Sequence, residues 1–451
     1  MSPVSMFKSR KLLHSPALLA GFAGVVLLSA CQEREIILPG QRLDPRTVTS
    51  PDGPPVEGAA AAPMTQAMLP AAQNAPDAVS RAGTPSHVAG NRAIGGGAQL
   101  IWSAPVGQPD DRRHRITADP VVAGGIVYAM DSRARVTATA TNGGRVWQTD
   151  LTPTGENPDS ASGGGLAYEN GRVFATTGFG ELVALDARSG GIAWRQRTGS
   201  PIGGAPTAER GTVYAVARDS SGWAVREADG KVLWQVSASR AQSGVTGVPA
   251  PAADGDLVVF PFSTGELMGV GSDGQQRWVA DVAGSRIGRA ISLLRDMTGE
   301  PVISGGRVYA ATSSGRIYAF DRQTGETIWT AREGANSAPL VTGNAVYVVN
   351  DQAQLVRLDA ATGGRVWAID LPYYTDARVK KQDRITASYG PILAGNRLFV
   401  ASSDGQLRIF DPTSGAPLGA AAIPGGAATA PVVAGQTLYV TGRDGNLHAF
   451  R

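Results

Sequence analysis

Histidine, the residue most often used in acid–base and metal chemistry, occurs four times in this chain of 451 residues, as His14, His87, His114 and His448. These histidines are far apart in the sequence and have no cysteine pair beside them. Because zinc sites need three or four His, Cys or carboxylate ligands, we predict no metal site. A Ser–His–Asp arrangement stays open from sequence alone, although the chain contains no Gly-x-Ser-x-Gly nucleophile elbow.

Other motifs that could bind a ligand are better explained as turns. The pairs Asp254-Gly255 and Asp404-Gly405 are turn sequences, and the glycine runs at 95–97 and 163–165 do not connect a strand to a helix as a phosphate-binding loop does. The chain has 41 basic and 38 acidic residues without a long basic run, so nucleic-acid binding is not indicated. We therefore predict no catalytic residues and no cofactor, and we do not expect an enzyme.

Cys31, the only cysteine, ends a pattern typical of export signals. Lys8, Arg10 and Lys11 form a positive start, and the apolar stretch 17–28 is too short to span ~30 Å of hydrocarbon as a helix. The stretch leads into Leu-Ser-Ala-Cys, which resembles the bacterial lipobox, where cleavage precedes a lipid-carrying cysteine. We predict a signal peptide at 1–30 and lipidation of Cys31; an uncleaved anchor is the alternative.

The residues after Cys31 suggest where the protein is sorted and how it is tethered. Gln32 stands where lipoproteins retained at the inner membrane have aspartate, so the resemblance implies the periplasmic face of the outer membrane. The segment 31–97 is rich in Pro, Ala and Gly and shows neither helical nor strand periodicity. Because such a segment cannot bury enough apolar surface to offset its chain entropy, we predict a disordered tether.

An internal repeat organises the rest of the chain, 98–451. A strand of the type Pro-Val-x-x-Gly-x-x-Val-Tyr-Ala occurs eight times, beginning near residues 120, 165, 206, 251, 301, 339, 391 and 431. A second strand and a turn of the form Leu-x-Ala-Leu-Asp-x-x-Thr-Gly-x-x-x-Trp follow, most clearly at Leu182 to Trp194 and Ile317 to Trp329. Units of about 40–50 residues with four short strands describe propeller blades. The tryptophans are expected to pack against a neighbouring blade, each with its N–H available for a partner.

The ends of the repeat region predict how the ring closes. In the seventh copy Gly419 replaces the tryptophan, and the eighth copy reaches the C-terminus before its last strand. The segment Gln99 to Ser103 contains a tryptophan but has no partner strands of its own. Pairing this segment with Leu447 to Phe450 would complete the last blade and leave no open sheet edge. We predict an all-β, eight-bladed β-propeller of four-stranded antiparallel blades, closed by its N-terminal strand.

The repeat with its Ala-x-Asp-x-x-Thr-Gly-x-x-x-Trp unit resembles that of the quinoprotein-like propellers. Within that superfamily, the lipobox and a single propeller are similar to the BamB family, lipoprotein subunits of the outer-membrane β-barrel assembly machinery. The resemblance implies a scaffold that binds the periplasmic domains of the barrel-assembly subunit, BamA, and helps unfolded outer-membrane proteins reach it. It implies no cofactor. Quinone-dependent dehydrogenases, the enzymes of the superfamily, hold their quinone against adjacent cysteines, which this chain lacks.

The resemblance also suggests partner-binding residues. The stretch Gly284 to Arg289, with the following Leu294-Arg-Asp296, is similar to a family loop between the fourth and fifth blades that binds the barrel-assembly subunit. Ile287, Arg289, Leu294 and Asp296 are the candidates that follow. Two departures weaken the transfer: Thr298 replaces a second acidic residue, and the family's Leu-x-Leu-Arg loop has no match at 242–248.

Strand alternation predicts that the long segments share one face of the propeller. The segments 103–119, 148–163, 279–300 and 368–390 link consecutive blades, and such links lie opposite the Thr-Gly turns. Loops of this length in compact domains are usually functional. The last one carries Tyr373 and Tyr374, followed by a basic run from Arg378, residue types enriched at interfaces. We expect Tyr373 and Tyr374 to contact a partner; a ligand- or glycan-sensing lipoprotein is the alternative to the assembly scaffold.

Overall fold

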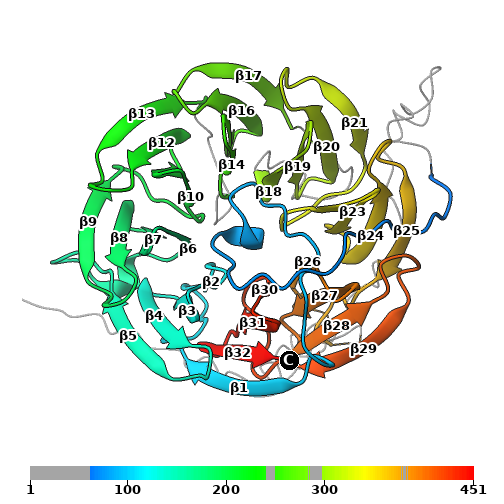
Figure 1. The fold of residues 1–451 in the computed structure, drawn as a ribbon, viewed down its shortest axis with the longest axis horizontal. Coiled ribbons are helices and arrows are strands. Elements are labelled where there is room, and N and C mark those ends of the chain that lie inside the picture. The colour runs from blue at the N-terminus through cyan, green and yellow to red at the C-terminus, as the bar shows by residue number, and fades with distance from the viewer. Residues whose placement is uncertain are drawn as a thin grey trace, which may run out of the picture.

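The structure is a computed structural model that describes residues 61–239, 249–282, 284, 297–376, 378, 382 and 384–451. Its strands form eight sheets of four antiparallel strands, which we number as blades 1 to 8 in chain order. The blades surround a common axis, each with its first strand innermost (Figure 1). The predicted eight-bladed propeller is therefore confirmed. In the part of the chain described, no helix has the length and apolarity needed to cross a bilayer.

Blades 1 to 4 take up the first half of the ring. Their strands are β2 (Val121–Ala123), β3 (Ile126–Met130), β4 (Arg135–Ala140) and β5 (Arg145–Asp150); β6 (Gly164–Glu169), β7 (Arg172–Thr177), β8 (Glu181–Asp186) and β9 (Ile192–Arg197); β10 (Thr207–Glu209), β11 (Thr212–Val216), β12 (Ser221–Arg226) and β13 (Val232–Ser237); and β14 (Ala252–Asp254), β15 (Leu257–Pro261), β16 (Glu266–Gly271) and β17 (Gln276–Asp281).

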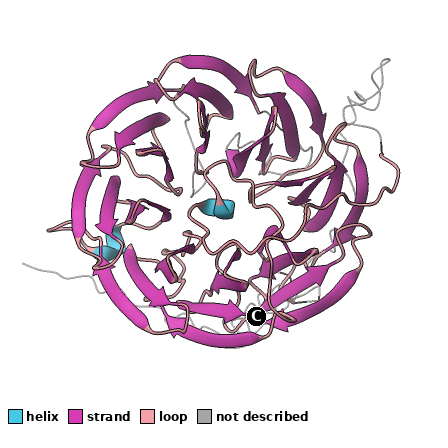
Figure 2. Cartoon of the chain, viewed as in Figure 1, coloured by secondary structure: helices cyan, strands magenta, loops and turns pink. Residues whose placement is uncertain are grey.

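Blades 5 to 8 complete the ring, and the residues that the structure describes also include two short 3-10 helices (Figure 2). The strands are β18 (Met297–Ser304), β19 (Arg307–Thr312), β20 (Arg316–Asp321) and β21 (Thr327–Ala331); β22 (Leu340–Thr342), β23 (Ala345–Val349), β24 (Gln354–Asp359) and β25 (Arg365–Asp370); β26 (Ser388–Ala394), β27 (Arg397–Ser402), β28 (Gln406–Phe410) and β29 (Pro417–Ala422); and β30 (Val432–Ala434), β31 (Thr437–Thr441), β32 (Asn446–Phe450) and β1 (Leu100–Pro105). The helices are η2 (Arg81–Gly83) and η3 (Pro158–Ser160).

The ring closes where the sequence predicts it. Strand β1 pairs antiparallel with β32, with Trp102 opposite Ala449 and Ala104 opposite Leu447. Gln99 and Arg451 extend this pairing by exchanging two backbone hydrogen bonds of 2.8 Å. The last sheet is thus built from both ends of the repeat region, and β1 covers the edge of β32 that would otherwise be open to another chain.

The outer strands are tied together by a tryptophan that docks on the next blade. Each indole Nε1 donates to a carbonyl of the following blade's turn, and each ring lies against that turn's positive-φ glycine, where a Cβ would clash. The pairs are Trp102 with Gly143, Trp147 with Gly190, Trp194 with Gly230, Trp234 with Gly274, Trp278 with Gly325, Trp329 with Gly363 and Trp367 with Gly415. The predicted packing role is confirmed.

Blade 7 lacks this tryptophan because blade 8 lacks the turn that would receive it. The last two strands of blade 8, β32 and β1, come from opposite ends of the repeat region and have no hairpin between them. Gly419 occupies the tryptophan position in β29, and its cross-strand partner is the large Ile409. In six of the other seven blades the residue opposite the tryptophan is alanine or glycine, which leaves room for the indole; the seventh has Arg357.

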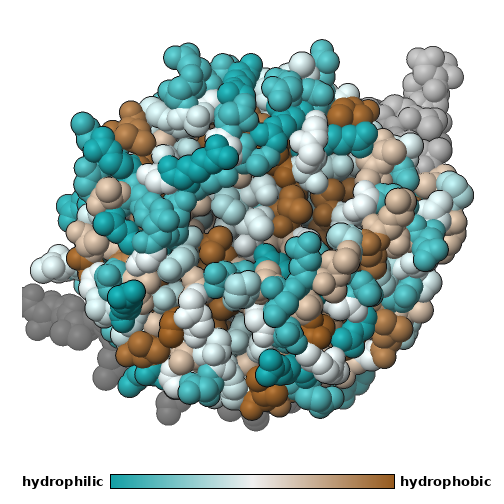
Figure 3. Space-filling view, viewed as in Figure 1, coloured by the Kyte–Doolittle hydropathy of each residue, from teal (hydrophilic) through white to brown (hydrophobic). Residues whose placement is uncertain are grey.

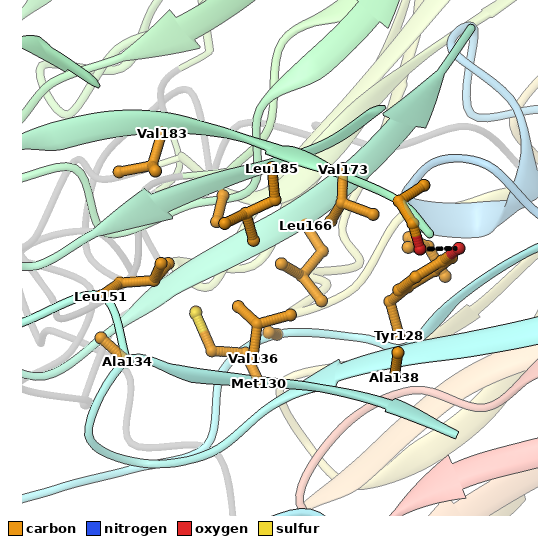
Figure 4. Close-up of a cluster of buried hydrophobic side chains, with 14 of the residues drawn as sticks. Tyr128, Met130, Ala134, Val136, Ala138, Leu151, Leu166, Val173, Val183 and Leu185 are labelled. Atoms are coloured by element: carbon orange, nitrogen blue, oxygen red, sulfur yellow. Dashed lines mark hydrogen bonds between the residues drawn. The ribbon is translucent and has the colours of Figure 1, made fainter. Parts of the chain in front are cut away.

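The hydrophobic core is divided among the gaps between blades. Eight clusters of buried side chains each join two neighbouring blades. Between blades 1 and 2, Met130 and Val136 pack against Leu166 and Val173, and the hydroxyl of Tyr128 donates to the carbonyl of Ala187 at 3.1 Å (Figure 4). Because each blade buries both faces, no blade has a hydrophobic core of its own.

Trp223, which lies outside the repeat position, has a structural place as well. It is half-buried on β12, where it packs against the cluster between blades 2 and 3, and its Nε1 donates to Ser221 Oγ at 2.8 Å.

Residues 61–97, predicted to belong to a disordered tether, instead cover the mouth of the propeller. This segment, which we call the plug, follows the rim from Ala62, crosses the ring and places η2 at its centre before joining β1 (Figures 1 and 2). The composition of this segment did not predict its ordered structure, because the plug has no hydrophobic core of its own. Its apolar residues use the gaps between blades: Leu69, Val79, Val88 and Ile94 each pack against a different cluster. Residues 31–60, with Cys31, lie outside the described part of the chain.

The plug backbone pairs with edges of the inner strands. Ala78 and Val122 exchange two hydrogen bonds of 2.8 Å, which adds a short antiparallel bridge to β2. Tyr168 N donates to Val79 O at 2.7 Å, and Ile303 N donates to Ser86 O at 3.0 Å. Inner strands of a propeller leave such backbone groups unpaired, and an extended segment satisfies them.

Candidate partner-binding surface

The two faces of the propeller differ because the strands alternate in direction. The face that carries the Thr-Gly turns, called here the hairpin face, also carries the turns between the first and second strands of each blade, and the plug lies on it. The opposite face, called the link face, carries the strand ends that the connections between blades join, and the described parts of the long segments begin and end there. Figure 3 is drawn in the same orientation as Figure 1, with the plug toward the viewer, and therefore shows the hairpin face. Apolar side chains are scattered over this face and form no single large patch.

One link forms a small ribbon. In the connection from β25 to β26, Tyr374 and Ile385 form an antiparallel bridge, Thr375 N donates to Arg384 O at 3.1 Å, and Thr386 N donates to Tyr373 O at 2.9 Å. The rings of Tyr373 and Tyr374 meet edge to face with centroids 4.8 Å apart. These contacts hold Tyr373 to Thr375 against Arg384 to Thr386 and so set how the side chains of these two short segments are presented.

The ribbon exposes apolar surface. Tyr374 is 41% exposed and Ile385 is 65% exposed, and their pairing places them side by side. Sequence analysis identified both tyrosines but missed Ile385, which is eleven positions from Tyr374. The sequence offered one indication of an exposed position at an interface: Ile385 is an aliphatic residue with polar neighbours in a long link. An exposed aromatic beside an exposed aliphatic side chain is the composition of an interface anchor.

The basic charge next to the ribbon is partly neutralised. Arg378 Nη2 lies 2.9 Å from Asp376 Oδ2, and the backbone N of Arg378 also donates to this carboxylate. Hydrogen bonding to Arg378 holds the pKa of Asp376 below its ordinary value. The pair therefore stays ionised near neutral pH and shapes the loop more than it attracts an acidic partner.

The other predicted partner residues, Ile287, Arg289, Leu294 and Asp296, lie outside the described residues. The ends of their link are described: β17 ends at Asp281 and β18 begins at Met297. This link precedes blade 5 and the ribbon precedes blade 7, so both belong to the link face and are separated by one further link, 332–339. The structure thus places the described ends of this link and the ribbon on the same face.

A cluster of charged residues fastens two other links together. His114 Nδ1 lies 2.9 Å from Asp111 Oδ2, and its Nε2 is 3.1 Å from the carbonyl of Asp159. Arg133 pairs with both aspartates. The hydrogen bond to Asp111 raises the pKa of His114. These residues satisfy one another, and no group of three potential metal ligands occurs within the described residues.

A serine, a histidine and an aspartate do meet at the closing seam. Ser103 Oγ lies 2.8 Å from His448 Nδ1, and His448 Nε2 lies 3.4 Å from Asp444 Oδ1. His448, which lies on β32 opposite Ser103 of β1, is fully buried, and burial lowers its pKa. The His448 imidazole has no exposed surface that a substrate could contact. We therefore interpret the Ser103–His448 contact as a structural hydrogen bond between β1 and β32.

Comparisons with known proteins agree with this architecture. The family model described as outer membrane protein assembly factor BamB matches residues 132–369 and 375–451. Proteins of that name from Yersinia pestis and Bordetella pertussis are 26% and 25% identical over 243 and 240 residues, each match covering 52% of this chain. The matches span 61% and 59% of the relatives' own lengths.

Solved structures share the fold. The crystal structure of BamB from Moraxella catarrhalis superposes with a TM-score of 0.66 at 20% identity, covering 79% of this chain and 100% of that one. A quinohemoprotein alcohol dehydrogenase from Comamonas testosteroni superposes with a TM-score of 0.62 at 16% identity, covering 84% of this chain and 81% of the enzyme. At these identities the likenesses show the fold alone, which scaffolds and enzymes share.

Proposed function

Because the chain belongs to the family of outer membrane protein assembly factor BamB, we propose that it is a non-catalytic scaffold in the assembly of outer-membrane β-barrel proteins. In this proposal it binds the periplasmic domains of the barrel-assembly subunit, a BamA-like protein, and helps unfolded outer-membrane chains reach it. The observation that carries the proposal within the structure is the exposed Tyr374–Ile385 pair on the link face.

The proposed lipid anchor is compatible with this surface. Ala62 N donates to Arg365 O at 3.0 Å, which holds this end of the plug on the hairpin face, opposite the ribbon. In this proposal, lipidation of Cys31 holds the protein at the periplasmic leaflet of the outer membrane. Acyl chains contribute about 0.8 kcal/mol per buried CH₂, and more than one chain makes anchoring stable.

Truncating the exposed pair should weaken the complex. We expect Tyr374→Ala and Ile385→Ala each to cost about 2 kcal/mol of binding free energy, roughly 30-fold in affinity, because both side chains would be buried against the partner. The measurement is recovery of the barrel-assembly subunit with tagged full chain from detergent-solubilised outer membranes. Leu418→Ala is the matched control: Leu418 is 54% exposed on the outer strand β29, outside the links. Equal recovery with all three variants would contradict the assignment.

A charge reversal tests the second predicted region. Asp296→Arg should reduce recovery of the same subunit at least tenfold, since like charge placed at an interface costs several kcal/mol, on the order of 2–5. The melting temperature should stay within about 1–2 °C of wild type, as for most surface substitutions. If Asp296→Arg recovers the subunit as well as wild type does, while Tyr374→Ala recovers less of it, then the ribbon is the contact and the link at 285–296 is not. If no variant affects any partner, a ligand-sensing role gains support.

A further inference from the structure

The side chain of Arg81 reaches from the plug into the propeller axis and meets two carboxylates. Its Nε lies 2.9 Å from Asp119 Oδ2, and its Nη1 lies 2.8 Å from Glu300 Oε1. Asp119 precedes β2 of blade 1 and Glu300 lies in β18 of blade 5, so the carboxylates come from opposite sides of the ring. Their side chains are 4% and 1% exposed, whereas Arg81 is 20% exposed. The site is thus buried but still in contact with solvent.

The blades hold the Asp119 carboxylate by a hydrogen bond and set the direction of the Glu300 side chain through the backbone of β18. Asp119 Oδ1 accepts a hydrogen bond of 3.1 Å from Ala430 N, which fixes its orientation from the link between blades 7 and 8. Glu300 lies in a β-bulge: Gly299 pairs with Ala311 and Val302 with Tyr309, so two residues of β18 face one of β19. Bulges redirect side chains, and this one gives Glu300 a direction that a regular strand would not.

The shape of the site favours a guanidinium group. Arg81 uses two different nitrogens for the two carboxylates, Nε for Asp119 and Nη1 for Glu300, whereas a compact ammonium carries all its donors on one nitrogen and would have to reach both walls from a single point. Burial raises the pKa of both carboxyls. Burying a carboxylate without a cationic partner is strongly unfavourable. Asp119 and Glu300 should therefore still bind a cation when no residue of the plug supplies one.

The rest of the plug fits the mouth less closely. Ser80 Oγ and His87 Nε2, on either side of η2, are buried without a hydrogen-bond partner among the residues that the structure describes. The remaining polar contacts to the inner strands are made largely by the backbone, which any extended segment could supply. Among the plug side chains, His87 adds one hydrogen bond to the Pro301 carbonyl, and Arg81 makes the ion pairs with blade carboxylates that select for a charged side chain.

We propose that Asp119 and Glu300 form a guanidinium-binding site at the propeller axis and that Arg81 is its resident ligand. The ligand class is the arginine side chain of an extended polypeptide segment, here supplied by the chain itself. If the site belongs to the blades, a guanidinium ion from solution should enter it once the Arg81 side chain is removed.

The test uses the full chain with Arg81→Ala and ethylguanidinium, which replaces the atoms that the substitution deletes. We expect Arg81→Ala to melt at a lower temperature than wild type. Millimolar ethylguanidinium, far below denaturing concentrations, should raise that temperature saturably, by roughly 3 °C at a tenfold excess over its Kd. Ethylammonium and urea should not, since one lacks the fork and the other the charge. An effect equal to theirs, or none, would overturn the proposal.

Two further variants exclude indirect effects. Adding Asp119→Asn and Glu300→Gln to Arg81→Ala should abolish the response to ethylguanidinium. Arg92→Ala is the matched control, because Arg92 donates to the carbonyls of Ala89 and Asp77 and should show no comparable rescue. If Arg81→Ala does not fold unaided, refolding with ethylguanidinium should restore a cooperative melt. No recovery, or equal recovery with ethylammonium, would then count against the site.

Discussion

Replacing Trp329 by alanine is expected to lower the free energy of unfolding by about 3–5 kcal/mol, the usual cost of removing a large buried aromatic side chain. The indole is 7% exposed, lies 5.9 Å from the ring of Tyr309 and donates to the carbonyl of Ala360 at 3.0 Å. It also covers Gly363 of the next blade, so the substitution opens a cavity between blades 5 and 6. The melting temperature should fall by on the order of 10 °C.

Two companion variants separate packing from hydrogen bonding. Trp329→Phe keeps most of the apolar contact and loses the N–H donor, and should cost about 1–2 kcal/mol. Ile328→Ala is the matched control, because Ile328 is the preceding residue of β21 and is 42% exposed. It should change stability by less than about 1 kcal/mol. The free energies of unfolding of wild type and the three variants are measured by thermal and urea denaturation. Equal losses of stability in Trp329→Ala and Ile328→Ala would refute the docking role of the tryptophan.

Acid should loosen the plug through His87. The ring is 1% exposed, its Nδ1 donates to the carbonyl of Pro301 at 2.8 Å, and burial lowers its pKa to about 4. Between pH 6.5 and pH 4 the unfolded chain therefore binds a proton that the folded chain does not. Stability contributed by neutral His87 is present above that range and is lost as the pH falls, by about 3 kcal/mol in total.

Other groups at the axis titrate in the opposite sense. Burial raises the pKa of Asp119 and of Glu300, so the folded state binds their protons more tightly, and this favours folding as the pH falls. Arg81 stays charged throughout and opposes protonation of His87. The contribution of His87 is therefore obtained from the difference between wild type and a His87 variant.

His87→Asn is the suitable variant. His87 has a φ of +61°, a conformation that asparagine tolerates, and the asparagine amide can still donate to the Pro301 carbonyl. Hydrogen exchange of the Ala78 and Val122 amides, which join the plug to β2, should accelerate between pH 6.5 and pH 4 in wild type once the intrinsic rate is corrected for. It should accelerate much less in the variant. Identical pH profiles for both proteins would show that His87 does not control the plug.

Sequence analysis predicted the features of the fold that depend on local, repeated chemistry. The alternating apolar strand recurs in every unit and the glycine turn with its following tryptophan recurs in most of them, so the copies support one another's interpretation. The segment Gln99 to Ser103 was predicted to close the ring because it has no partner strand of its own, while the eighth copy at the other end of the repeat region lacks its last strand. Gly419 was visible as a break in the pattern, and the structure supplies its reason: blade 8 has no turn to receive an indole.

The plug, the axial site and the exposed pair on the ribbon were decided by tertiary structure. Residues 61–97 carry no periodicity because their partners are gaps and strand edges contributed by many blades, and a pattern within a segment does not record partners elsewhere. Arg81, Asp119 and Glu300 meet only because blades 1 and 5 face each other across the closed ring. Ile385 is exposed beside Tyr374 because backbone pairing folds the link back on itself. Sequence periodicity thus determined the blades, and closure of the ring determined which distant residues meet.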